Sequence, residues 1–222
     1  MNKEYEGYFN YLKELSNKIE QLPSNVTIDR DILYLQHETT VYKIKAARYF
    51  MNKMRELLPV REAISLDDIN VFSFQVDAFL LTLSSTLDSL GAEINLVYNL
   101  EYNKNEIYFD GLVKDRRLIS LESDLQGYLE EEIYQSWYSY FRTLRNQTAH
   151  RLFPFYAILP EGPVQLWHRP ITTKDVYFPD DIRAQPPHFD KRIRVISFCE
   201  RMLENVMQLL LKSYRFMETR LL

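Results

Sequence analysis

The chain has 222 residues, 46% of them hydrophobic, and its 27 basic and 31 acidic side chains give a formal net charge of −4. This length fits one domain, or one domain with an extension. The negative charge argues against a protein that coats nucleic acid without specificity, and Cys199, the single cysteine, excludes a disulfide within the chain. No apolar run approaches the roughly 20 residues of a membrane helix. We therefore expect a cytoplasmic protein with no membrane segment.

Two helices are predicted in the first sixty residues. The first covers about 3–22 and ends at Pro23, and the second covers about 29–58 and ends before Pro59. The apolar positions of the second helix are Ile32, Leu35, Val41, Ile44, Ala47, Phe50 and Met51. His37 also lies on this helix, and no His or Cys stands at metal-ligand spacing from it. We interpret His37 as a structural or solvated residue.

The third predicted helix, about 66–99, has the most regular apolar spacing in the chain. Its stripe consists of Ile69, Phe72, Val76, Phe79, Leu80, Leu83, Leu87, Leu90, Ile94 and Val97. Along one flank, at roughly heptad steps, lie Asp77, Ser84, Asp88 and Asn95. Either this flank faces solvent, or Asp77 or Asp88 pairs with Arg145 or Arg142 of the next long helix and holds its guanidinium.

A connection over 101–118 leads to a predicted helix over about 120–153, which ends because Pro154 follows. Apolar residues recur at helical spacing at Leu129, Ile133, Trp137, Tyr140, Phe141 and Leu144. The first half of this helix is acidic. The second half is basic from Arg142 to Arg151, so phosphate groups would bind there.

The end of this helix carries Arg145, Asn146 and His150 in the pattern R-N-x-x-x-H. At about 100° per residue, Arg145 and His150 border a polar face on opposite sides, with Ala149 near its middle. A small residue between polar groups would suit close packing against a second copy. A histidine can move protons and an arginine can hold developing negative charge, which suits phosphate chemistry. The alternative is that these are ordinary surface residues.

Residues 154–188 interrupt the helices. Residues 156–159 and 164–167 can pair as a short hairpin, and the rest is an irregular loop that either forms a lid over the motif or is pinned to the bundle. A last helix is predicted over about 189–222, with Cys199 as an inert core thiol. The patterns together predict an all-α chain with about five long helices and one loop or short hairpin insertion.

The segment Arg145-Asn146-Gln147-Thr148-Ala149-His150 resembles the R-x4–6-H motif of the HEPN superfamily, and the helix over 66–99 resembles the helix that packs against that motif. The resemblance covers roughly Ser65 to Leu222. It implies an antiparallel helical bundle over 65–222 with an insertion at 154–188, preceded by an N-terminal extension, 1–64. It also implies a homodimer whose composite site cuts RNA without a metal or other cofactor.

The resemblance further implies a role for each site residue. His150 would act as general acid or base, Arg145 would stabilise the transition state, and Asn146 would orient phosphate or His150. Arg142 and Arg151 would bind the RNA substrate. The setting implied is a toxin or antiviral defence system, restrained by a partner such as an antitoxin. Two alternatives stay open, because the superfamily has members that do not cleave RNA: a non-catalytic interaction module, or the helical partner of a nucleotidyltransferase.

Overall fold

The computed structural model describes residues 3–23, 28–57, 66–103, 108–150, 157–158, 176–178 and 193–221. The predicted all-α class is confirmed, and the long helices α2, α3 and α8 pack antiparallel. The helices in these ranges are α1 (Lys3–Glu20), α2 (Arg30–Leu57), α3 (Leu66–Tyr98), α4 (Phe109–Val113), α5 (Arg116–Leu121), α6 (Ser123–Tyr134), α7 (Ser136–His150) and α8 (Val195–Leu221). The strands are β1 (Ala157–Ile158), β2 (Val176–Phe178) and β3 (Ile193–Arg194), which pair antiparallel in the order β1-β2-β3.

The chain divides into two compact units. The first comprises residues 1–44, 85–138 and 205–222, and the second comprises 45–84 and 139–204. The helices α2, α3, α7 and α8 each contribute a segment to both units. The expected division of the chain at residues 64 and 65 stays a prediction.

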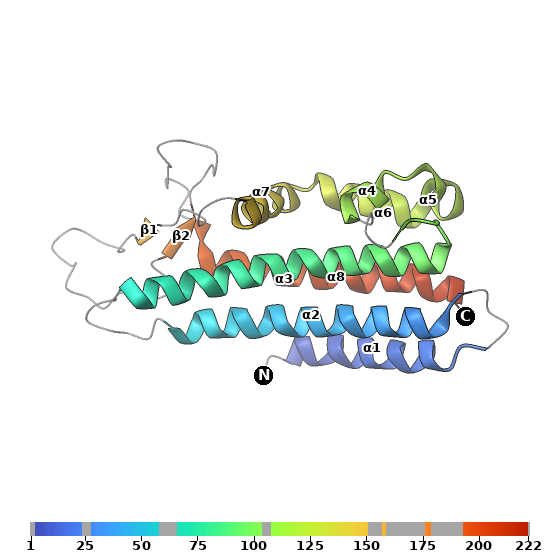
Figure 1. The fold of residues 1–222 in the computed structure, drawn as a ribbon, viewed down its shortest axis with the longest axis horizontal. Helices are drawn as coiled ribbons and strands as arrows, with labels where there is room; N and C mark the ends of the chain where they lie inside the picture. The colour runs from blue at the N-terminus through green and yellow to red at the C-terminus, as the bar shows by residue number, and fades with distance from the viewer. Residues whose placement is uncertain are drawn as a thin grey trace. The chain divides into compact units, whose positions relative to one another are not determined.

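In the first unit, α1 lies beside the first half of α2 (Figure 1). Leu12 and Ile19 of α1 are buried, as are Leu33 and Ile44 of α2. Two contacts show that α2 and α3 run antiparallel. The side chain of Gln36 donates to the carbonyl of Ser89, and the side chain of Lys43 donates to the carbonyl of Ser85. The later residue of α2 thus contacts the earlier residue of α3.

In the second unit, aromatic rings attach the short sheet to the helices. Phe178 of β2 is buried, and its ring centroid lies 5.5 Å from that of Phe198 on α8. Tyr140 of α7 packs against the same ring at 5.2 Å. Cys199 is fully buried, and burial raises the pKa of its thiol, which agrees with the inert core residue that the sequence predicts.

The stripe predicted for α3 is buried at every position whose side chain is described, from Phe72 to Val97. The helix ends at Tyr98, one residue before the predicted end, because Asn99 adopts a left-handed backbone with φ of 48°. The side chain of Asn95 then binds the backbone of Tyr102 on both sides, accepting from its N–H at 3.1 Å and donating to its carbonyl at 3.4 Å.

The prediction of one helix over 120–153, preceded by a connection, was wrong. The structure has α4 and α5 within the predicted connection, then α6 and α7 separated by Gln135, whose ψ of 145° is extended. Leu129 before the break and Phe141 and Leu144 after it are buried and keep helical spacing in the sequence, so periodicity alone does not reveal the break. The start of α5 is fixed by Asp115, whose carboxylate accepts from the N–H of Arg117 at 2.6 Å.

Three smaller predictions also need correction. Leu35 lies on the exposed side of α2, with 65% of its surface accessible, and does not belong to the apolar stripe. Residues 157–158 form a strand as predicted, but they pair with 176–178, while the other predicted strand, 164–167, lies outside the described residues. The last helix begins at Val195, because Ile193 and Arg194 pair with β2.

Candidate functional site

The motif residues lie on α7, which begins after the extended residue Gln135 and ends at His150. Its buried side consists of Tyr138, Phe141 and Leu144. This places Arg145 and Asn146 at the border of the buried side, where both are half-buried, while Arg142 and Ala149 are exposed. The polar face that the sequence predicts around Ala149 is therefore accessible in this structure.

Arg145 is fixed by hydrogen bonds within the second unit. Its Nε donates to the Ser84 hydroxyl of α3 at 2.9 Å, and its Nη1 donates to the Asn146 Oδ1 at 2.9 Å. Because these bonds use two different nitrogens of a planar guanidinium, they set the orientation of the whole group. Asn146 thus orients the arginine itself, a contact that the sequence pattern did not specify.

Asp77 of α3 contacts α7 through Thr148. The Thr148 hydroxyl donates to the Asp77 Oδ1 at 3.3 Å. The α3 flank predicted to face either solvent or α7 therefore contacts α7 at two positions, Asp77 and Ser84. The expectation that Asp77 holds an arginine of the motif stays a prediction, since its described hydrogen bond is with a threonine.

Burial raises the pKa of Asp77 above its ordinary value of 3.8, and the hydrogen bond from Thr148 offsets only part of this effect. The folded state therefore binds this proton more tightly than the unfolded state, and stability falls as the pH rises from about 4 through the raised pKa. We expect Asp77→Asn to be more stable than the parent protein above that window and to lose this advantage below it. Unfolding by denaturant at several pH values measures the difference.

Asp88, the second candidate acid, belongs to the first unit. Its Oδ1 accepts from the backbone N–H of Phe109 at 3.2 Å, at the start of α4. Its predicted pairing with Arg142 or Arg145 stays a prediction. The side chain of His150 and the whole of Arg151 lie outside the described residues, as does most of the segment 154–188.

The described part of the motif can hold an anion beside α7 in a fixed orientation. Arg145 supplies an oriented positive charge, and the exposed Arg142 adds a second one on the same helix. His150 is the last residue of α7. Guanidinium groups with a histidine nearby suit the binding and proton transfers of phosphodiester chemistry.

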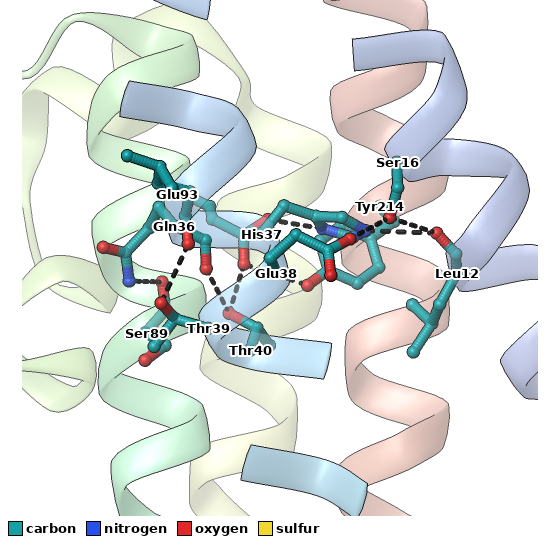
Figure 2. A network of polar contacts seen from close by, with 11 residues as sticks. Leu12, Ser16, Gln36, His37, Glu38, Thr39, Thr40, Ser89, Glu93 and Tyr214 are labelled. Carbon is teal, nitrogen blue, oxygen red and sulfur yellow. Dashed lines mark hydrogen bonds and ion pairs between the residues drawn. The ribbon is translucent and has the colours of Figure 1, made fainter. Parts of the chain in front are cut away.

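A second polar cluster, in the core of the first unit, was not predicted. His37 is fully buried, with its Nδ1 3.0 Å from the Glu93 Oε2 and its Nε2 3.2 Å from the carbonyl oxygen of Leu12 (Figure 2). The other oxygen of Glu93 accepts from the hydroxyls of Thr40 and, at 3.0 Å, Tyr214. A carbonyl oxygen can only accept, so the Nε2 of His37 donates to Leu12, and a second proton on Nδ1, facing Glu93, makes the ring an imidazolium.

The environment of His37 shifts its pKa in the same direction. Burial alone would lower the pKa, but the hydrogen bond and charge of Glu93, the Leu12 carbonyl and the charge of Glu38 outweigh it, so the pKa is raised above 6.5. The sequence carried one usable signal for this pair, since His37 shares the apolar side of α2 with Leu33, Ile44 and Met51. A histidine at such a position requires a buried partner.

The described helices include none that is long and apolar enough to cross a membrane. Within the same residues, no group of three or more His, Cys, Asp or Glu side chains is arranged to hold a metal ion. No family model, curated protein or solved structure matches the chain. The HEPN resemblance therefore depends on the segment 145–150 and on α3.

Proposed function

We propose that the protein is a metal-independent endoribonuclease of the HEPN type, with a composite site formed by two copies of α7. The observation that carries this proposal is the fixed Arg145. Its guanidinium is oriented by Ser84 and Asn146, and Arg145 stands five residues before His150 and one helical turn before the exposed Ala149. Such an arginine stabilises negative charge without having to reorganise during the reaction.

The reaction that fits these groups is transesterification at a phosphodiester. One His150 removes the proton from a ribose 2′-hydroxyl, and the 2′-oxygen attacks the adjacent phosphorus. The bond from phosphorus to the 5′-oxygen breaks, and the His150 of the second copy donates a proton to that oxygen. The products are a 2′,3′-cyclic phosphate and a free 5′-hydroxyl. Arg145 balances the charge on the phosphoryl oxygens, and Arg142 and Arg151 bind the flanking backbone.

The biological setting we propose is RNA cleavage in a toxin–antitoxin or antiviral defence system. An enzyme that cuts cellular RNA must be restrained, so this proposal includes an inhibitory partner protein.

The 2′-hydroxyl requirement tests the reaction. In EDTA, the purified protein should cut a single-stranded RNA and leave the same sequence intact when every ribose is replaced by 2′-deoxyribose. The RNA with 2′-O-methyl groups should also remain intact, because the attacking oxygen is blocked. Equal cutting of the RNA and the deoxy strand would contradict the proposal.

A second function is favoured by one specific observation. Arg145 already donates two hydrogen bonds inside its own chain, as expected for a structural network in a non-catalytic interaction module or in the partner of a nucleotidyltransferase. Ala149→Trp should block self-association in the enzyme and in the self-associating module, because the bulky side chain would stand in the seam. Only the enzyme predicts that His150→Ala keeps the dimer and abolishes RNA cleavage.

A further inference from the structure

The first unit contains a small pocket between α2 and α3 that takes no part in the proposed ribonuclease site. Its volume is about 210 Å³. The residues that define its chemistry are Ile32, Gln36, Lys43, Asp88, Ser89 and Leu96.

Lys43 supplies one charged group to this pocket. Its ammonium donates to the hydroxyl of Ser89 at 2.6 Å and to the carbonyl of Ser85 at 3.2 Å. These two bonds use two of its three hydrogens, which leaves one donor for a ligand. Burial lowers the pKa of Lys43, against the charge of Asp88, so an added acceptor would relieve an incompletely solvated cation.

Asp88 supplies the opposite charge. Neither hydrogen bond of the Lys43 ammonium goes to this carboxylate, although the two charges interact. One carboxylate oxygen is held by the N–H of Phe109. The pocket therefore presents a cationic and an anionic group, each fixed by its own neighbours.

The polar wall is held in place before any ligand binds. The Gln36 amide donates to the Ser89 carbonyl at 3.4 Å, a contact visible in Figure 2. Thr40, one turn along α2, is bonded to the buried Glu93. Asn95, which also lines the pocket, is bonded to the backbone of Tyr102. Groups fixed in this way lose little conformational freedom when a ligand binds.

From this arrangement we propose that the pocket binds a free aliphatic α-amino acid in its zwitterionic form. The ligand carboxylate would accept from Lys43, its ammonium would donate to Asp88, and its side chain would lie against Ile32 and Leu96. The balanced pair of charges disfavours phosphate and phosphate-bearing ligands, whose negative charge Asp88 would repel. This inference is independent of the ribonuclease proposal.

Titration of the full chain with leucine tests the pocket directly. We expect leucine to shift the methyl resonances of Ile32 and Leu96 and to give a saturable calorimetric signal. The decarboxylated analogue, 3-methylbutylamine, and the deaminated analogue, 4-methylpentanoate, should each bind about tenfold more weakly or worse, because each lacks one of the two charged groups that Lys43 and Asp88 would bind.

Two variants and one control complete the experiment. Lys43→Met and Asp88→Asn should each weaken leucine binding about tenfold or more, while Lys45→Met, an exposed lysine on α2, should leave it unchanged. Circular dichroism identifies a variant that fails to fold. In that case, binding of the two analogues to the parent protein decides whether the pocket requires both charged groups of leucine. The proposal is overturned if leucine shifts neither methyl group, if the folded variants bind as well as the parent, or if both analogues match leucine.

Discussion

Glu93→Gln should lower the free energy of unfolding by about 3 kcal/mol or more, the largest stability effect we expect from a near-isosteric change in this chain. The carboxylate neutralises His37 and accepts from Thr40 and Tyr214, all in a region closed to water. The glutamine amide has no charge, and its NH₂ group, which can only donate, would face side chains that also donate. Since small domains have only about 5–15 kcal/mol of stability, this loss is a large fraction of the total.

The same substitution should reverse the pH dependence that His37 contributes. In the parent protein the pKa of His37 is higher in the folded state than in the unfolded state, so the folded state binds the proton more tightly. The contribution of His37 to the free energy of unfolding is therefore complete below about pH 6.5 and is lost as the pH rises through the folded pKa. The groups that face His37 are Glu93 of α3, Glu38 of α2, Tyr214 of α8 and, on α1, the Leu12 carbonyl. Without the Glu93 charge, burial lowers the pKa of His37, and its contribution then increases with pH.

Denaturant unfolding across this pH range measures both effects, and Glu204→Gln on the exposed side of α8 is the matched control, with an expected change below about 0.5 kcal/mol. A loss of less than about 1 kcal/mol for Glu93→Gln, with an unchanged pH trend, would show that His37 is not held as a buried imidazolium.

Arg145→Ala should reduce RNA cleavage by about 10²–10³-fold, the usual cost of removing one oriented group that stabilises transition-state charge. Stability should fall much less, by about 1–3 kcal/mol, because two side-chain hydrogen bonds are lost from a half-buried position. Arg145→Lys keeps the charge but loses the planar group, so we expect an intermediate rate. Cleavage rates under single-turnover conditions separate these variants.

The control for Arg145 is Arg201→Ala, which removes an exposed arginine of α8 in the same unit and should leave the rate unchanged. Full activity in folded Arg145→Ala would exclude the proposed role of the guanidinium. An equal loss in Arg201→Ala would point to general electrostatic attraction of RNA instead.

Most of the helical architecture was predictable because apolar spacing on a helix reports directly on burial. On α3 the predicted stripe is buried wherever its side chains are described, and the helix ends within one residue of the prediction. The break at Gln135 was not predictable, since the apolar residues keep helical spacing in the sequence across it. The helices α4 and α5, with 5 and 6 residues, are too short to show a helical period. The exposure of Leu35 depends on which helices pack around α2, and that is a property of the tertiary fold.

The candidate site was predictable in its residue types and less so in its contacts. Arg145 and Asn146 were identified from the motif, but their bond to one another depends on side-chain rotamers, which spacing does not specify. The contact of Ser84 with Arg145 was anticipated only as part of a polar flank on α3. The pairing of His37 with Glu93 joins residues 56 positions apart, so it becomes visible only when α2 and α3 are packed together.

The central claim is tested most directly by end-group analysis of a labelled mixed-sequence RNA incubated in EDTA with the parent protein, His150→Ala or the matched control His188→Ala at equal purity. We predict fragments ending in 2′,3′-cyclic phosphate with the parent protein and the control, and intact RNA with His150→Ala. Equal cutting by the parent protein and His150→Ala, or intact RNA with both, would contradict a ribonuclease site at the end of α7.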